Sequence, residues 1–366
     1  MKKIVIASDS FKGTLTSAQV ADSVEKGIRS VYPDCEVVKL NVADGGEGTM
    51  DAVCATCPHA LVPVEVSDPL GRKIRTAYAV LDDGTAVIEM SMASGLTLLA
   101  PQERNPLVTS TYGTGEMIAD ALSKGCRKFL IGLGGSATND AGTGMLSALG
   151  YRFLDAAGKV LPSDGGSLIQ IVSIDTSAVN PYLHESEFMV ACDVDSPLYG
   201  PSGAAYVFAP QKGASSEMVS VLDAGLKNFA KVTGQDAGFP GAGAAGGLGY
   251  ALKSFLGARM VRGIDLILDA VGFDSAVQGA DLVITGEGRY DDQTKSGKTV
   301  FGVMARAEMY GVPVIVTAGS VASPSSFVLC ASAADGSYAD SEDISAAVER
   351  FLLSQSKKDA FCAEKV

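Results

Sequence analysis

A glycine-rich stretch at residues 131–146 combines exposed backbone groups with hydroxyl, amide and carboxyl side chains. It reads IGLGGSATNDAGTGML and continues the strand-like segment RKFL. Glycine is unfavourable inside helices and strands because it loses the most backbone entropy on folding. A strand, a glycine loop and a helix start would point backbone N–H groups and hydroxyls at one spot beside the positive helix end. The stretch therefore predicts an anion site, most usefully for phosphate; the alternative is an ordinary strand-to-helix turn with a capping side chain. The candidate ligands are Gly134, Gly135, Ser136, Thr138, Asn139 and Asp140.

Carboxylates and glycines recur after other apolar runs. A single carboxylate at a strand end is usually a turn former, but several in one cleft would repel one another unless a metal ion or a proton offsets their charge. Glycines that approach phosphate, carboxylates that hold Mg²⁺ or take a proton, and basic residues that neutralise charge are the parts of a phosphoryl-transfer site. The four segments are Asp9-Ser10-Phe11-Lys12-Gly13, Asp44-Gly45-Gly46-Glu47-Gly48, Asp193-Val194-Asp195 and Gly286-Glu287-Gly288-Arg289.

Individual roles follow from residue type and position. Asp193 is the candidate general base because it ends the apolar run FMVAC, and Asp195 is expected on the same strand face, so the choice between the two stays open. Lys12 and Arg289 are candidate catalytic charge partners for phosphate or a substrate carboxylate, although an isolated lysine is often a solvated loop residue. The metal candidates are Asp195 and Glu287, and the further candidate ligands of substrate or phosphate are Asp9, Ser10, Gly45, Gly46, Gly286, Glu287 and Gly288.

Several named motifs are incomplete in this sequence. The G-x-G-x-x-G pattern at Gly241 follows Phe-Pro rather than a strand, and the one that begins at Gly132 does not lie in the first strand-to-helix turn, so a dinucleotide site is poorly supported. DQTKSGKT ends like a phosphate-binding P-loop, but Asp292 replaces its first glycine. Cys54 and Cys57 match C-x-x-C, but no second pair or suitably placed histidine completes a zinc site.

Composition restricts the class of partner. The 366-residue chain carries a net charge of −13, and no cluster of lysine and arginine occurs, so nucleic acid and anionic membranes are not expected as partners. The 7 scattered cysteines are typical of a reducing cytoplasm. No signal-like start or run of 18 apolar residues is present, so we expect a cytoplasmic globular protein.

Both ends of the chain alternate strands with helices. Strand KKIVIA, a helix that begins at the capping box of Thr16 and Gln19, and strand EVVKLN form a βαβ unit. Strands at 280–288, 312–320 and 326–332 alternate with helices near 298–310 and 342–355. These elements predict one doubly wound α/β domain with a five-stranded parallel sheet, made of residues 1–62 and 276–366.

The middle of the chain has a different pattern. Three strand-like runs joined by Pro-Leu-Gly and Asp-Asp-Gly turns predict an antiparallel meander, and further helices and strands follow it. Residues 63–275 are therefore expected to form an inserted α+β domain with a mixed sheet. GFPGAGAAGGLG, at 238–249, is either a flexible joint or a loop that enters a helix.

Six sequence blocks resemble, in the same order, those of the bacterial glycerate kinase family: DSFKGTLTS, VADGGEGT, GLGGSATNDAG, ACDVDSPLYGPSGAAYVFAPQKGA, GAGAAGGLG and ADLVITGEGRYDDQT. The resemblance implies ATP-dependent phosphorylation of D-glycerate with Mg²⁺, 2-phosphoglycerate as the favoured product, and a flavodoxin-like domain that carries a second α/β domain. Residues that depart from the family pattern are Ser8, Ser196, Tyr290 and Asp292.

Two other functions remain to be distinguished at this point. A non-catalytic sensor of a phosphorylated metabolite would keep the glycine loops but has no use for so many carboxylates. A nicotinamide-dependent dehydrogenase would need a glycine fingerprint after the first strand, where the sequence reads DSFKG. The sequence is compatible with a monomer or a homodimer.

Overall fold

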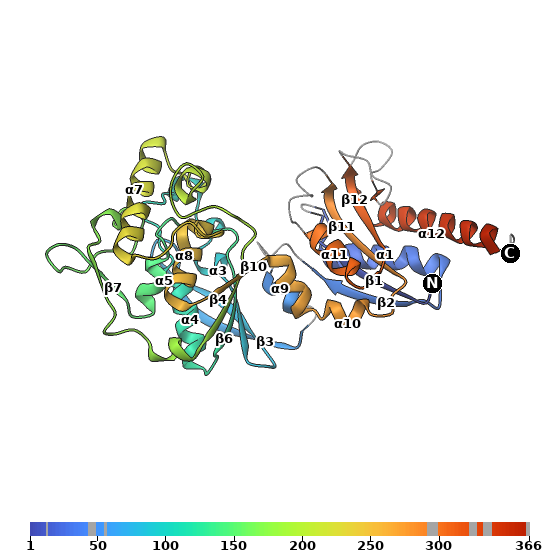
Figure 1. Cartoon of the computed structure of the whole chain (residues 1–366), viewed down its shortest axis with the longest axis horizontal. Helices are drawn as coiled ribbons and strands as arrows, with labels where there is room; N and C mark the ends of the chain where they lie inside the picture. Colours follow the sequence, from blue (N-terminus) through green and yellow to red (C-terminus); the bar gives the residue numbers. More distant parts are fainter. Residues whose placement is uncertain are drawn as a thin grey trace. The chain divides into compact units, whose positions relative to one another are not determined.

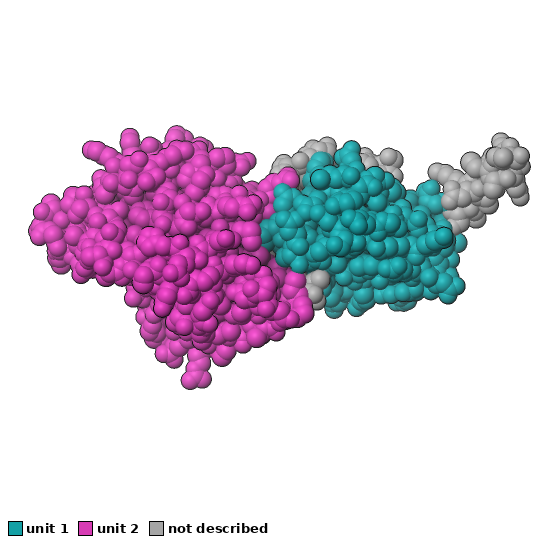
Figure 2. All heavy atoms as spheres, turned by 60° about the horizontal axis from the view of Figure 1, so that its bottom comes forward, with its two compact units in different colours: residues 1–44, 264–366 teal, residues 45–263 magenta. Residues whose placement is uncertain are grey.

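The computed structural model describes residues 1–11, 14–42, 49–54, 57–290, 299–321, 328–331 and 339–363. The chain divides into two compact units, a first unit of residues 1–44 and 264–366 and a second unit of residues 45–263 (Figure 2). The first boundary precedes the one expected after residue 62, since residues 59–62 already pair within the sheet of the second unit. The second boundary follows residue 263 rather than residue 275. No helix of the described chain is long and apolar enough to span a membrane.

The first unit contains a five-stranded sheet in the order β13-β12-β11-β1-β2 (Figure 1). All neighbouring strands are parallel, as the sequence predicts. β1 lies between β11 and β2, and its residues 4–7 are fully buried, which is typical of a central parallel strand. The strands are β1 (Lys3–Ser8), β2 (Glu36–Asn41), β11 (Leu282–Tyr290), β12 (Val314–Val321) and β13 (Val328–Cys330).

The helices of the first unit alternate with these strands. α1 begins after the predicted capping box of Thr16 and Gln19, and it packs so closely against α12 that a Cβ at Gly27 would lie 2.6 Å from the carbonyl oxygen of Ser345. The helices are α1 (Ser17–Val31), α9 (Gly263–Ala270), α10 (Phe273–Val277), α11 (Thr299–Glu308) and α12 (Ser341–Ala363).

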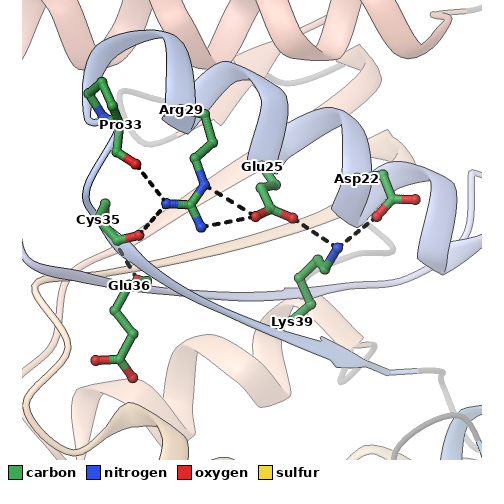
Figure 3. A network of polar contacts seen from close by, with 7 residues as sticks. All are labelled: Asp22, Glu25, Arg29, Pro33, Cys35, Glu36 and Lys39. Atoms are coloured by element: carbon green, nitrogen blue, oxygen red, sulfur yellow. Dashed lines mark hydrogen bonds and ion pairs between the residues drawn. The ribbon is translucent and has the colours of Figure 1, made fainter.

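A polar network joins α1 to the start of β2 (Figure 3). The guanidinium of Arg29 donates to the carbonyl oxygens of Pro33 and Cys35 at 2.9 and 2.6 Å, while Lys39 binds Asp22 and Glu25. Exposed ion pairs add little stability, so the bonds to the two carbonyls are the part that fixes the turn between helix and strand.

The second unit contains a six-stranded mixed sheet in the order β10-β9-β6-β5-β4-β3. β3, β4 and β5 form the predicted antiparallel meander, and β5, β6, β9 and β10 are parallel. A separate two-stranded sheet pairs β7 (Arg152–Leu154) with β8 (Ser173–Asp175). The strands of the large sheet are β3 (His59–Ser67), β4 (Lys73–Leu81), β5 (Thr85–Glu89), β6 (Lys128–Gly132), β9 (Glu187–Ala191) and β10 (Arg259–Val261).

Helices and an aromatic cluster complete this second unit. Phe229 of α7 contacts Phe153, Tyr250 and Phe255, so α7, α8 and β7 share one apolar core. The GFPGAGAAGGLG segment leads directly into α8, which corresponds to the helix-entry alternative. The helices are α2 (Thr49–Cys54), α3 (Ser91–Ser94), α4 (Tyr112–Ser123), α5 (Thr143–Ala148), α6 (Ala204–Phe208), α7 (Ser216–Thr233) and α8 (Ala244–Leu256), with short 3-10 helices at Leu96–Leu98, Pro101–Glu103, Leu168–Gln170, Pro181–Glu185 and Pro210–Lys212.

Candidate active site

The parallel strands of the second unit end at one edge of its sheet. Glu89, Gly132, Ala191 and Val261 are successive register partners across β5, β6, β9 and β10. The glycine loop after β6 and the acidic segment after β9 therefore leave the same edge from neighbouring strands. Ligands of α/β proteins bind outside the carboxyl ends of parallel strands, which makes this edge a candidate site.

Asp140 organises the end of the glycine loop. Its carboxylate accepts hydrogen bonds from the N–H groups of Thr111, Gly142 and Gly144 at 2.8, 3.0 and 3.2 Å and from the Thr111 hydroxyl at 2.8 Å. The residue is fully buried, and this burial raises the pKa of Asp140 while the bonds from Thr111, Gly142 and Gly144 oppose the rise. Asp140 therefore fixes the turn into α5, and its ligand role stays a prediction.

A second glycine segment, at the start of α8, packs against this loop. A Cβ at Gly246 would lie 2.1 Å from the carbonyl oxygen of Thr138, and the N–H of Ala141 donates to the carbonyl of Gly246 at 3.0 Å. Ala141 and Ala245 have φ values of 52° and 51°, the positive-φ non-glycine residues of the described chain. Backbone strain of this kind persists where the surrounding structure fixes the conformation, often at functional sites.

Lys212 is the main residue of this site that the sequence analysis did not identify. Its side chain is 1% exposed, and its Nζ donates to Ser136 Oγ at 2.8 Å and to the carbonyl oxygen of Thr138 at 2.7 Å. Burial lowers the pKa of Lys212 to about 7, and the nearby charge of Asp140 opposes this shift. In the sequence the residue is a single lysine between Gln211 and Gly213, and its place in the block ACDVDSPLYGPSGAAYVFAPQKGA is the signal that could have identified it.

Some buried polar atoms near this edge have no hydrogen-bond partner among the described residues. They include Thr49 Oγ1, Thr138 Oγ1 and both polar atoms of the Asn139 amide. Each such group costs about 1–3 kcal/mol, so native proteins usually satisfy it with ordered water or a ligand. These atoms favour a polar ligand or bound water beside the loop.

Asp193 and Asp195 lie beyond the end of β9. The Oδ1 atom of Asp193 accepts a hydrogen bond from the N–H of Gly263 at 2.9 Å, and both aspartates are exposed. The prediction that Asp193 and Asp195 lie on the same face of one strand was wrong. β9 ends at Ala191, and residues 192–197 are not in a strand. Asp193 and Asp195 occupy a loop, so the choice of base stays a prediction.

The first unit carries a second group of candidate residues, at the carboxyl end of β1. The carboxylate of Asp9 accepts bonds from the Ser10 N–H at 2.7 Å and from the hydroxyl of Thr299, the first residue of α11, at 3.0 Å. The Asp9 N–H donates to the carbonyl of Gly286 at 3.0 Å. β1 and β11 thus bring Asp9, Ser10 and Gly286 together.

Gly286 is a glycine because its neighbours leave no room for a side chain. A Cβ there would lie 2.4 Å from Thr317 Oγ1 and 2.8 Å from Ser8 Oγ. β11 continues through Tyr290, so Glu287, Gly288 and Arg289 lie in the strand rather than in a loop after it. Glu287 is half-buried and Arg289 is exposed. Lys12, Gly45 and Gly46 lie outside the described residues.

An open hollow of about 810 Å³ lies elsewhere in the second unit, between α7 and residues 235–238. Lys227, Lys231 and Tyr199 are among its lining residues, and no predicted site residue lines it. In the part of the chain that the structure describes, no three acidic, histidine or cysteine side chains are grouped as a metal site.

A model of the glycerate kinase family matches residues 4–336. The chain belongs to this family. It is 49% identical over 332 residues to the glycerate kinase of Bacillus subtilis (strain 168), covering 89% of this chain and 87% of that protein. It is 46% identical over 325 residues to the glycerate 2-kinase of Escherichia coli (strain K12), covering 87% and 85%.

A solved structure is similar over almost the whole length. The crystal structure of a Salmonella typhimurium LT2 protein assigned as glycerate kinase 2 matches with a TM-score of 0.87 and 40% identity, covering 98% of this chain and 99% of that one. The chain is thus an α/β member of a family of phosphotransferases, as the six sequence blocks predict. The alternatives of a metabolite sensor and a nicotinamide-dependent dehydrogenase are not supported by these relationships.

Proposed function

We propose that this protein transfers a phosphoryl group from ATP to D-glycerate, with 2-phosphoglycerate as the favoured product. The observation that carries the proposal is the glycine loop of residues 134–140, held at the carboxyl edge of parallel strands by Asp140 and Lys212. Such a loop offers backbone N–H groups and hydroxyls to an anion. The named relatives support ATP and glycerate as the substrates.

In this proposal the general base is Asp193, which deprotonates the acceptor hydroxyl. A general base must reach the proton it removes, and an exposed carboxylate next to the glycine loop in strand order suits that role. Lys12 and Arg289 would neutralise charge on the transferred phosphate or the glycerate carboxylate. Asp9, Ser10 and Gly286 would form a further ligand surface at the end of β1.

Mg²⁺ is proposed as the metal, and Asp195 of the second unit and Glu287 of the first unit are each a candidate protein ligand. In phosphoryl-transfer sites Mg²⁺ usually binds one or two carboxylates together with substrate phosphates and water. Carboxylate oxygens such as those of Asp195 and Glu287 are the ligand type that this ion prefers. When bound, the ion would neutralise charge on the phosphate oxygens.

We also propose that the first unit is a flavodoxin-like domain that carries the second unit as an insertion. Numbered within that unit, its strands run in the order 2-1-3-4-5, which is the flavodoxin-like order. β1 and β11, which carry Asp9 and Gly286, are the neighbours at which ligands bind in this topology. The net charge of −13 favours a protein without nucleic-acid or membrane partners. The 7 scattered cysteines favour a cytoplasmic enzyme, which we propose to be a monomer or a homodimer.

The proposal is tested by incubating the protein with Mg-ATP and D-glycerate. We expect ADP release that depends on glycerate, and phosphorus NMR should place the new phosphate on the 2-hydroxyl. If the phosphate is on the 3-hydroxyl, the product is 3-phosphoglycerate, and the proposed kinase reaction still holds. No turnover by folded protein across several divalent metals and nucleotides would overturn the proposed function.

A further inference from the structure

Lys212 and Ser136 form a polar pair that joins the buried and the accessible sides of the glycine loop. Lys212 is 1% exposed, whereas Ser136 is half-buried. The Lys212 amine donates to Ser136 Oγ at 2.8 Å and, from the same nitrogen, to the carbonyl oxygen of Thr138 at 2.7 Å. One cation therefore binds the loop at two points.

The direction of these bonds determines what Ser136 can do. A serine hydroxyl has one O–H donor and two lone pairs, and a lysine amine in this contact donates. The Ser136 oxygen is thus used as an acceptor, which leaves its O–H free to donate to another group. A hydroxyl that accepts from a cationic donor becomes a stronger donor itself, because hydrogen bonds in a chain polarise one another.

We propose that Lys212 and Ser136 act as a charge-assisted donor to an anionic oxygen of the substrate, either of a phosphate or of the glycerate carboxylate. Ser136 makes the contact, and Lys212 is the positioning residue that orients and polarises it. The proposal rests on the proposed function for the identity of the anion. It assigns the anion contact to the Ser136 hydroxyl, rather than only to the backbone of the loop.

The surroundings of Lys212 support a charge-related role over a purely structural one. A buried lysine costs stability, and a well-packed apolar side chain in its place is often neutral or stabilising. Asp140 is the charged group that acts on Lys212, but its carboxylate is already bound by Thr111, Gly142 and Gly144. The pKa of Lys212 near 7 allows an anion at the loop to draw the amine into its charged form.

A double-mutant cycle tests the pair. Ser136→Ala, Lys212→Met and the double variant are assayed for kcat and for the KM values of ATP and glycerate, with Lys227→Met, on the exposed face of α7, as the control. We expect each single variant to lose about 10–100-fold in kcat/KM. The kcat/KM of the double variant should lie within about threefold of that of the less active single variant, because both changes break the same chain of hydrogen bonds.

The KM values separate the two sources of the anion. A rise in the KM of glycerate alone would assign the contact to the glycerate carboxylate. A rise in the KM of ATP alone would assign the contact to a phosphate. If the double variant loses kcat/KM by the product of the two single losses, Lys212 and Ser136 act independently and the proposed coupling is overturned. If Lys212→Met does not fold, Ser136→Thr, which keeps a hydroxyl, is compared with Ser136→Ala, and an alanine variant within twofold of the wild type overturns the proposal.

A pyrophosphate-binding experiment tests the anion contact independently of the proposed kinase reaction. If the wild type does not phosphorylate glycerate, calorimetry with pyrophosphate is carried out on the wild type and the same variants. Affinity that falls at least tenfold in Ser136→Ala and Lys212→Met, but not in Lys227→Met, would support the anion contact without the reaction. Absence of binding by the wild type, or equal affinity in the wild type and all the variants, would overturn it.

Discussion

The carboxylate of Asp193 accepts a hydrogen bond from the backbone N–H of Gly263, with 2.9 Å between Oδ1 and nitrogen. Gly263 is the first residue of α9 and the last residue of the second unit. An exposed loop aspartate is thereby oriented by the backbone at the point where the chain passes from one unit to the other. Asparagine in its place can still accept this bond through its amide oxygen, so the substitution removes basicity while the backbone contact is kept.

We expect Asp193→Asn to lower kcat by about 10²–10⁴-fold, the usual contribution of a general base. Because the Gly263 bond can be retained, the thermal unfolding temperature should stay close to that of the wild type. Steady-state kinetics and a thermal melt of the same preparation measure both effects. Asp195→Asn is the comparison variant: a loss below tenfold in Asp193→Asn together with a far larger loss in Asp195→Asn would contradict the assignment of Asp193 as the base.

Lys212 should make the stability of the protein depend on pH. Its pKa is about 7 in the folded chain, well below the value of about 10.4 for an unperturbed lysine. Between these values the unfolded chain binds more protons than the folded chain, so the free energy of unfolding should rise with pH by up to about 1.4 kcal/mol per pH unit. Below pH 7 both states bind the proton, and this dependence disappears.

Urea unfolding at pH 7.5 and 9.5 measures this slope. The wild type should gain stability from Lys212 deprotonation as the pH rises, and Lys212→Met should lack that part of the gain. The difference between the two proteins isolates Lys212 from the other titrating groups. Equal slopes in the two proteins would show that the amine does not titrate in this range.

The elements that local patterns specify were the predictable part of the structure. The capping box of Thr16 and Gln19 and the turns between β3, β4 and β5 each follow from neighbouring residues, and the structure confirms them. The five-stranded parallel sheet was also predictable, because the same alternation of strand and helix occurs at both ends of the chain.

The parts that depend on distant contacts could not be read from local sequence. Lys212 is placed beneath the glycine loop by tertiary packing, 74 residues from Thr138 in the chain. The positive φ of Ala141 and Ala245 is likewise unexpected, because local propensity assigns such conformations to glycine. The end of β9 at Ala191 was missed for a different reason, because the apolar run FMVAC continues to Cys192, one residue beyond the last paired residue.

Gly286→Ala should destabilise the first unit. The added Cβ would lie 2.4 Å from Thr317 Oγ1 and 2.7 Å from the Thr317 carbonyl oxygen, and the backbone oxygen cannot rotate away. Overpacking of this kind typically costs about 1–3 kcal/mol. Urea unfolding measures the change, and Gly238→Ala serves as the control because the nearest atom to its Cβ is Asp236 Oδ1 at 3.4 Å. Equal stability of the two variants would contradict the close approach of β11 to β12 at this residue.

Two adjacent residues, Ala245 and Gly246, should differ in their tolerance of substitution. Gly246→Ala places a Cβ 2.1 Å from the carbonyl oxygen of Thr138 at a φ of +68°, so we expect a loss of at least about 2 kcal/mol from left-handed strain and overpacking together. Ala245→Gly relieves the strain of an alanine at φ 51° but adds entropy to the unfolded chain, so it should stay within about 1 kcal/mol of the wild type.

The Thr138 carbonyl that Gly246 approaches also accepts a hydrogen bond from Lys212. Displacement of this carbonyl in Gly246→Ala should therefore lower turnover as well as stability, whereas Ala245→Gly should keep turnover within about threefold. Urea unfolding and steady-state kinetics of both variants check the pair. A stable and fully active Gly246→Ala would mean that the two glycine segments do not need to pack closely, and that the conformation of residues 138–141 does not depend on the α8 segment.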